Sequence, residues 1–209
     1  MATFNGSDTP DSLTGTNTAD DLYGNEGDDT LYGAEGSDSL FGGIANDSLY
    51  GDGIGLTEGA GYDTLNGGDG NDYLYDDAAG AELHGDAGND QLELRNATGL
   101  ADGGDDQDQI LIYQAANSTV LGGTGDDTIT GEFSTALTVN GGDGNDRIIG
   151  LYELTEAWTV SGGLGNDTIA LSGANHMIDS GEGDDLIDLE SSGPGTATIT
   201  TGTGTDVIR

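Results

Sequence analysis

Aspartate recurs every nine residues near the start of the chain, and a column of carboxylates is a chemical feature in itself. The first positions in this register are Asp11, Asp20, Asp29, Asp38 and Asp47. Stacking like charges one turn apart costs roughly 1 kcal/mol per pair in water, and severalfold more at an effective dielectric of 20. Such a column therefore requires cations between its members. Carboxylate and backbone carbonyl oxygens are hard donors and the chain has no Cys, so we expect Ca²⁺ rather than zinc or copper.

The aspartate series continues to the end of the chain at a longer interval. After an insertion at 51–62, its members are Asp63, Asp72, Asp90, Asp108, Asp127, Asp146, Asp167, Asp185 and Asp206. From Asp72 onward the interval is 18 to 21 residues, about twice the original. The half-turns in between have lost the aspartate but keep an apolar residue, such as Leu83 or Val120.

The elements that must position these carboxylates are short strands. An apolar residue two places after each aspartate predicts one inward-facing position per nine-residue unit, followed by a tight glycine-rich turn. Two units of opposite direction complete one turn of a flattened helix, whose strands stack in parallel about 4.8 Å apart. The sequence thus predicts an all-β fold, a parallel β-roll (β-solenoid) of about ten turns. We expect Ca²⁺ ions stacked along one edge and a short run on the other.

The repeat also predicts how the chain is organised. We expect a single solenoid domain over residues 1–209. Residues 6–75 carry nonapeptide repeats on both edges, interrupted by the insertion at 51–62, and residues 76–209 carry the motif on one edge only. The turns of the other edge beyond Asp63 are expected to be metal-free. Trp158 is in phase with Val160 and is expected in the core, whereas His84 and His176 are expected at the surface.

The composition excludes several classes of function. The chain has 40 Asp and Glu against 3 Lys and Arg, a formal net charge of −37, so nucleic acid and anionic membrane surfaces are poor partners. No apolar run approaches the length of a membrane span, and the N-terminus lacks the pattern of an ordinary signal peptide. No catalytic triad spacing, zinc-protease motif or phosphate-binding loop is present, so we do not expect an enzyme. A chain so acidic and rich in glycine is expected to be disordered unless its charge is neutralised.

The loops resemble a known repeat family. Segments such as GNEGDD (24–29), GGTGDD (122–127) and GGDGND (67–72 and 141–146), each followed by x-apolar-x, are similar to the GGxGxDxUx nonapeptide of the RTX (repeats-in-toxin) proteins. The resemblance covers the chain from Gly6 to Ile208. Thr9 and Thr18 stand where the family has glycine, so weaker binding is expected at the N-terminal loops.

The family resemblance implies a ligand set. Each ion is expected between two loops one turn apart, held by the carbonyls of the second and fourth residues of the first loop, the carbonyls of the first and third residues of the next, and both loop aspartates. All fourteen aspartates named above are candidates. The candidate carbonyl ligands are Asn25, Gly27, Gly42, Ile44, Gly67, Gly68, Asp69, Gly70, Gly85, Asp86, Ala87, Gly88, Gly103, Asp105, Gly122, Gly123, Thr124, Gly125, Gly141, Gly142, Asp143, Gly144, Gly162, Gly163, Leu164, Gly165, Ser180, Gly181, Glu182, Gly183, Thr201 and Thr203. The resemblance implies roughly 8 to 12 Ca²⁺ ions of the extracellular type.

Function is expected to follow from the metal. The leading hypothesis is a calcium-binding structural module of a secreted bacterial protein, exported by a type I-like route and folding on Ca²⁺ outside the cell. The alternative is an adhesion or carbohydrate-binding module, with a polysaccharide or cell-surface ligand on the motif-free edge. Ice binding is disfavoured because the outward position after each aspartate is too irregular, changing from Thr128 to Arg147 to Leu186.

Overall fold

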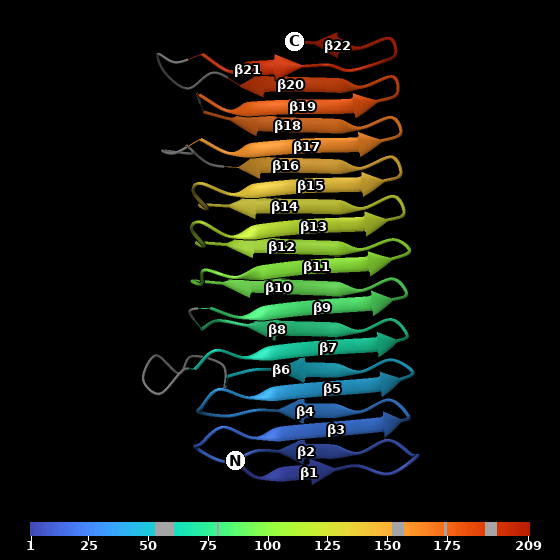
Figure 1. Ribbon diagram of the computed structural model, residues 1–209, viewed down its shortest axis with the longest axis vertical. Helices are drawn as coiled ribbons and strands as arrows, with labels where there is room; N and C mark the ends of the chain where they lie inside the picture. The colour runs from blue at the N-terminus through green and yellow to red at the C-terminus, as the bar shows by residue number, and fades with distance from the viewer. Residues whose placement is uncertain (53–60, 79, 152–156, 174, 191–195) are drawn as a thin grey trace.

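The chain folds into a long stack of short strands. The computed structural model describes residues 1–209 except 53–60, 79, 152–156, 174 and 191–195. Within these ranges the protein forms 22 strands and no helix. Figure 1 shows the strands stacked along one axis, with the two termini at opposite ends. The predicted all-β parallel roll is confirmed.

The strands alternate between two parallel sheets. The odd-numbered sheet contains β1 (Thr3–Asn5), β3 (Asp21–Glu26), β5 (Ser39–Ile44), β7 (Thr64–Asp69), β9 (Glu82–Ala87), β11 (Leu100–Asp105), β13 (Thr119–Thr124), β15 (Thr138–Asp143), β17 (Thr159–Leu164), β19 (Met177–Glu182) and β21 (Thr198–Thr200). The even-numbered sheet contains β2 (Ser12–Thr14), β4 (Thr30–Tyr32), β6 (Ser48–Tyr50), β8 (Tyr73–Asp76), β10 (Gln91–Arg95), β12 (Gln109–Tyr113), β14 (Thr128–Glu132), β16 (Arg147–Leu151), β18 (Thr168–Ser172), β20 (Leu186–Glu190) and β22 (Val207–Ile208). Each turn therefore adds one strand to each sheet.

The strand register follows the apolar repeat. In the odd-numbered sheet Leu22 pairs with Leu40, and Leu40 pairs with Leu65. In the even-numbered sheet Ile129 pairs with Ile148. A slip of one residue would turn every apolar side chain outward, so the repeat itself specifies the pairing.

The core is the space between the two sheets. The two predicted apolar columns meet there and are buried except near the ends of the roll, where Ile208 is 53% exposed. The buried members of the core include Leu22, Leu31, Leu40, Leu49, Leu65, Leu74, Leu83, Leu92, Ala101, Ile110, Val120, Ile129, Val139, Ile148, Val160, Ile169, Ile178 and Ile187.

The core widens along the roll. The even-numbered strands have three residues up to β6 and five from β10 to β20. The longer strands bury a second side chain, such as Leu94 or Ile112. Trp158 is fully buried, as expected, and its indole Nε1 donates a hydrogen bond to the carbonyl of Ser134 at 3.2 Å. The early turns have only the narrow core, so they depend more on other interactions.

The insertion predicted at 51–62 cannot be compared in full with the structure, because residues 53–60 lie outside the described residues. On either side of it, β6 and β8 pair directly, and so do β5 and β7. The two sheets are therefore continuous past this point.

We predict that Gly131→Val destabilises the roll by about 1 to 3 kcal/mol, the usual cost of overpacking a core. A Cβ at Gly131 would overlap the indole ring of Trp158, and neither can move without disturbing a neighbouring turn. Thr130→Val, on the outward face of the same strand, is the control. Denaturant unfolding in saturating Ca²⁺ measures both, and equal midpoints for the two variants would contradict this packing.

Candidate functional site

The loops that follow the odd-numbered strands line one edge of the roll, at the right of Figure 1. We call this the motif edge. Its loops are 6–11, 24–29, 42–47, 67–72, 85–90, 103–108, 122–127, 141–146, 162–167, 180–185 and 201–206. The loops that follow the even-numbered strands form the opposite edge. The predicted aspartates fall into two columns, with Asp20, Asp38 and Asp63 on the opposite edge and the other eleven on the motif edge.

Glycines in these loops bring carbonyl oxygens toward the adjacent turn. Gly142 and Gly144 have φ of 118° and 140°, a region that a side chain disfavours. A Cβ at Gly142 would overlap the carbonyl oxygen of Gly123, and one at Gly144 would overlap that of Gly125. The carbonyls of the second and fourth loop residues therefore point at the next loop along the axis.

A ladder of hydrogen bonds holds the aspartates in line. The backbone N–H of each motif-edge aspartate donates to Oδ1 of the aspartate one turn later, as Asp108 does to Asp127 at 2.8 Å and Asp127 to Asp146 at 2.9 Å. The same bond joins each successive pair from Asp11 to Asp206. One oxygen of each carboxylate is thus committed, and the orientation of the group is fixed.

In most of these aspartates the second carboxylate oxygen, Oδ2, has no hydrogen-bond partner. Most of these aspartates are only 1–2% exposed, so water does not satisfy them. Among the repeat aspartates, the buried Oδ2 atoms without a hydrogen bond belong to Asp29, Asp38, Asp47, Asp63, Asp72, Asp90, Asp108, Asp127, Asp146, Asp167 and Asp185. A buried charged oxygen left unpaired is costly, so the geometry calls for a positive ligand along each column.

Most of the unpaired oxygens lie close to the first glycine of their own loop and to a carbonyl of the next loop. Asp127 Oδ2 and the carbonyl oxygen of Gly141 both lie less than 3.0 Å from the point where a Cβ on Gly122 would stand. A side chain at Gly122 would therefore collide with both oxygens, so only glycine lets the carboxylate and the carbonyl oxygen lie this close to the backbone and to each other. The same arrangement recurs at Gly24, Gly42, Gly67, Gly85, Gly103, Gly141 and Gly162. Carboxylate and carbonyl oxygens with no nitrogen or sulfur suit Ca²⁺.

The predicted carbonyl ligands are not all equally free. The third-residue carbonyls already accept a backbone hydrogen bond from the fourth residue of the preceding loop, as Asp143 does from Gly125 at 2.7 Å and Leu164 from Gly144 at 2.7 Å. A carbonyl oxygen has a second lone pair, so this bond does not prevent coordination. The carbonyl ligand set stays a prediction.

The first loop on each edge departs from this pattern. Asp11 Oδ2 accepts hydrogen bonds from the N–H and the hydroxyl of Ser7, at 2.6 and 2.8 Å. Asp20 Oδ2 accepts the same pair from Thr16, both at 2.6 Å. These bonds lower the pKa of both carboxyls. In these two loops a hydroxyl donates to Oδ2, the oxygen that has no hydrogen bond in most of the other loops. Weaker metal binding at the N-terminal loops stays a prediction, which this contact supports.

The last full turn also departs from the pattern. Ser180 stands where the preceding motif-edge loops, from 6–11 to 162–167, have glycine, and it is fully buried. Its hydroxyl donates to the carbonyl of Thr201 at 3.3 Å. The gap between Asp185 and the 201–206 loop is therefore narrowed by a side chain.

On the opposite edge, neutral groups replace the carboxylates after Asp63. Residues 81, 99, 118, 137, 158 and 176 take the aspartate position in successive turns. The ladder bond is kept by neutral acceptors in two of these turns: Gly99 donates to Ser118 Oγ at 3.2 Å, and Trp158 donates to His176 Nδ1 at 3.1 Å. These turns need no cation to balance a buried charge.

His176 corrects the sequence prediction. It was expected at the surface but is 1% exposed. Its Nδ1 accepts from Trp158, and its Nε2 lies 3.2 Å from the carbonyl of Ser172. Burial lowers its pKa, which keeps the ring neutral. The sequence signal for this role is its phase, since His176 precedes Met177 and Ile178 as Asp63 precedes Thr64 and Leu65.

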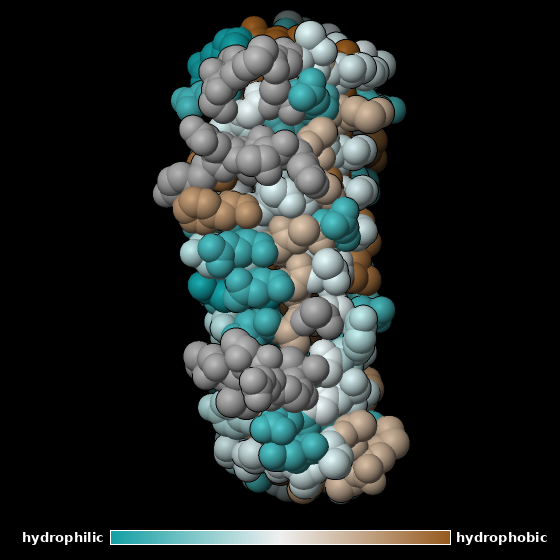
Figure 2. Space-filling view, turned by 90° about the vertical axis from the view of Figure 1, so that its left-hand side faces the viewer, coloured by the Kyte–Doolittle hydropathy of each residue, from teal (hydrophilic) through white to brown (hydrophobic). Residues whose placement is uncertain are grey.

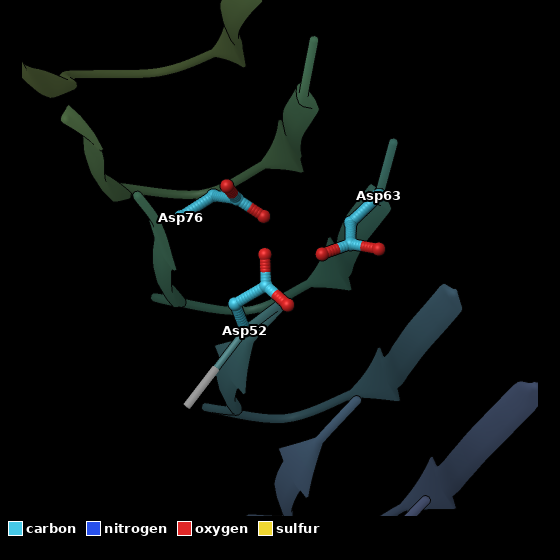
Figure 3. A group of neighbouring side chains, drawn as sticks. All are labelled: Asp52, Asp63 and Asp76. Atoms are coloured by element: carbon cyan, nitrogen blue, oxygen red, sulfur yellow. The ribbon is translucent and has the colours of Figure 1, made fainter. Parts of the chain in front are cut away.

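Two further carboxylates were missed by the sequence reasoning. Asp52 and Asp76 are buried beside Asp63 on the opposite edge, and the three groups point toward one another (Figure 3). Neither residue falls at the aspartate position of the repeat. The sequence did offer one sign of this group: Asp76 stands at a loop position that is glycine in the two preceding turns, Gly33 and Gly51.

Comparison with known families agrees with the geometry. The model of the RTX calcium-binding nonapeptide repeat matches residues 5–40, 14–49, 59–75, 115–134, 138–151 and 159–187, more than half of the chain. The chain belongs to the RTX repeat family. RTX repeats in a β-solenoid indicate a calcium-binding structural module. No curated protein matches the chain.

The structure extends the RTX pattern beyond the matched segments. The loops 85–90 and 103–108 lie outside them. Asp90 and Asp108 nevertheless have the same ladder bond and the same unpaired Oδ2 as Asp127. The motif edge is thus one uninterrupted row from Asp29 to Asp185.

We predict that acid can replace calcium in folding the metal-free chain. Burial, reinforced by neighbouring carboxylates, raises the pKa of Asp47 and Asp127 from 3.8 to about 7 and that of Asp108 to about 8. Because these pKa values are raised in the folded state, the stability contributed by protonation is fully present below pH 3.8. It is lost as the pH rises through about 7 to 8.

Far-UV circular dichroism of the EGTA-treated protein as a function of pH measures this effect. We expect β structure at about pH 3 and a coil spectrum above neutrality. A calcium-loaded sample over the same range is the control. A metal-free chain that is more folded at neutral than at acid pH would contradict the inferred burial of the carboxylates.

Proposed function

We propose that this RTX roll is a structural module of a secreted bacterial protein that is unfolded at low Ca²⁺ and folds when Ca²⁺ binds outside the cell. The observation that carries the proposal is the row of buried, unpaired Oδ2 atoms along the motif edge. RTX repeats are typical of secreted bacterial proteins, which supports the cellular location. Export by a type I-like route is part of the same proposal.

The charge of the chain explains why calcium could act as the switch. Without cations, a net charge of −37 opposes any compact state. Twelve Ca²⁺ ions would bring the net charge to about −13 and remove the repulsion where it is strongest. Ions in the gaps between successive motif-edge aspartates, with a short run on the opposite edge, give the proposed number of roughly 8 to 12.

The binding free energy is sufficient for this role. A site occupied at a hundred times its dissociation constant contributes about 2.7 kcal/mol to folding. Eight such sites would contribute about 20 kcal/mol, more than the typical net stability of a domain. Loss of calcium would therefore unfold the roll, and supply of calcium would fold it.

We also propose that residues 1–209 act as one solenoid domain with two parts. The continuity of both sheets supports this. In residues 6–75 calcium would lie on both edges, and in residues 76–209 on the motif edge. The exchange of carboxylates for Ser118, Trp158 and His176 supports metal-free turns on the opposite edge.

The described residues give no support for catalysis, and the RTX roll is generally a structural rather than a catalytic module. No helix within the described ranges has the length and apolar character that crossing a bilayer requires.

The adhesion or carbohydrate-binding alternative stays a prediction without a specific observation in its favour. Figure 2 shows the opposite edge face on, where the coloured surface is largely hydrophilic or neutral. The residues that replace aspartate there, such as Trp158 and His176, are buried and unavailable to a ligand.

We predict a cooperative transition from coil to β structure when Ca²⁺ is added to the EGTA-treated chain at neutral pH. Far-UV circular dichroism measures it, and Mg²⁺ is the control, because Mg²⁺ gives up its water reluctantly and needs strict octahedral geometry. A β spectrum that EGTA leaves unchanged at neutral pH would mean that the wide core folds without calcium. This result would contradict the proposal that Ca²⁺ binding drives folding.

We predict that Gly122→Ala removes one ion from the motif edge. The added methyl would collide with both Asp127 Oδ2 and the Gly141 carbonyl oxygen and would push these two oxygens apart. Native mass spectrometry should count one Ca²⁺ fewer, and unfolding at high Ca²⁺ should show a loss of about 2.7 kcal/mol. Thr119→Ala, an exposed position on the same strand, is the control. An unchanged ion count would place the metal elsewhere.

A further inference from the structure

The opposite-edge column ends at Asp63 in an unusual way. Thr64 pairs with Glu82, and the N–H of Glu82 donates to the carbonyl of Asp63. Ala81 therefore occupies the position at which the repeat would place the next aspartate of this column. The usual second carboxylate is therefore missing. In its place Asp76 occupies the first position of the next loop, directly above Gly51.

Asp76 supplies a side-chain oxygen where other loops supply a carbonyl. A Cβ on Gly51 would meet Asp76 Oδ2 and Asp63 Oδ2, both closer than 3.0 Å. Two oxygens approach a glycine in the same way along the motif edge, but here both oxygens belong to carboxylates. Asp52, the residue after Gly51, adds a third (Figure 3).

The three carboxylates form a compact and buried group. Asp52 and Asp63 are each 1% exposed and Asp76 is fully buried. One oxygen from each lies within 4.8 Å of the other two. In Figure 3 the carboxylates of Asp52 and Asp76 face each other, with that of Asp63 beside them.

The backbone orients this group but does not satisfy it. Asp63 Oδ1 accepts from the N–H of Asp38 at 2.8 Å, and Asp76 Oδ1 accepts from the N–H of Ala78 at 2.7 Å. The remaining oxygens, Oδ2 of Asp63, Oδ2 of Asp76 and both oxygens of Asp52, are buried without any hydrogen bond. Four oxygens are thus directed into one space with no donor.

The surroundings add no positive charge. The charges that act on Asp52 come from carboxylates, chiefly Asp63, Asp77 and Asp38. The arginine ion pairs of the described residues are made with Glu93 and Asp188. Two carboxylates at 4 Å repel by about 4 kcal/mol at an effective dielectric of 20, so three of them require a cation or protons.

We propose that Asp52, Asp63 and Asp76 bind a Ca²⁺ ion that closes the opposite-edge column, and that this site fills at a lower Ca²⁺ concentration than the repeat loops. Oxygen donors alone select a hard cation. Three carboxylates around one ion carry more charge than the two that a repeat loop pair supplies, and affinity rises with ligand charge. The proposal revises the expectation that every turn beyond Asp63 on this edge is metal-free.

The site lies where the roll changes from two motif edges to one. Below it, the narrow core depends on both columns of aspartate; above it, the wider core begins with β10 and Leu94. An ion bound early at this position would order the loops on both sides of the insertion. Asp63 belongs to the repeat motif but Asp52 and Asp76 do not, so substitutions at these two positions test the site separately from calcium binding by the RTX loops.

The alternative occupant is a proton. Burial raises the pKa of Asp76 to about 9, so a protonated Asp76 could share its proton with Asp63 and leave the site without metal. The two occupants predict different ion counts, and the count decides between them.

The test is native mass spectrometry of the full chain at a series of free Ca²⁺ concentrations. Asp52→Asn and Asp76→Asn are the variants, and Asp179→Asn, an exposed aspartate on β19, is the charge-matched control. We expect each variant to hold one ion fewer than the wild type. The free Ca²⁺ concentration at which the first ion binds should rise by about tenfold in each variant. The control should match the wild type.

The outcomes separate this proposal from the proposed function. A wild type that binds one ion, lost in both variants, would support this site and overturn calcium binding by the repeat loops. A wild type that binds several ions, with none lost in either variant, would overturn this site and leave the loops unaffected. Circular dichroism in saturating Ca²⁺ confirms folding of the variants. Crystals of the wild-type chain grown in Ca²⁺ give an independent answer, because absence of an anomalous peak between the three carboxylates would also overturn the site.

Discussion

The hydrogen bond from each aspartate N–H to the carboxylate of the next turn is the interaction on which the rest of the roll depends. It holds Asp108, Asp127 and Asp146 at the spacing of the parallel strands, which is far closer than free carboxylates would settle. By committing Oδ1 to the backbone it leaves Oδ2 buried and unpaired. The bond that defines the turn thus also leaves a buried oxygen that only a proton or a cation can satisfy.

The two edges show two solutions to one problem. On the motif edge the charge is kept and a cation is needed to balance it. On the opposite edge, beyond Asp63, the acceptor becomes a serine hydroxyl or the neutral ring of His176, and larger apolar groups such as Trp158 fill the space behind it. Apolar burial stabilises without regard to ions, so the later turns have a wide apolar core beside their aspartates, whereas the early turns have only a narrow one.

The repeat made most of this fold predictable. A period of nine with an apolar residue at a constant offset specifies strand, turn and register together, which is why Leu22, Leu40 and Leu65 stack as expected.

The sequence predictions failed where a residue was judged by its type and not by its position in the repeat. His176 was placed at the surface because histidine has no role in the motif, although its phase in the repeat is that of Asp63. Asp52 and Asp76 were overlooked for the converse reason: they are acidic but fall at positions where the motif has no carboxylate, and only the three-dimensional stack brings them to Asp63. The hydroxyls of Ser7 and Thr16 were equally hidden, since the motif says nothing of side chains that could satisfy the aspartate in place of an ion.

The direction of the hydrogen bonds has a mechanical consequence. Both the strand pairing and the aspartate ladder run along the long axis of the roll, and among the described residues the strands of each turn bond only to those of the turns beside it. A force applied between the two ends would therefore load these contacts in series, so the weakest pair of turns would separate first and the others would follow singly. Each released turn of about 18 residues would lengthen the chain by roughly 60 Å. A bound cation that bridges two loops would raise the force needed to separate those two turns and no others. The resistance of the roll to stretching would therefore vary along its length with the positions of the ions.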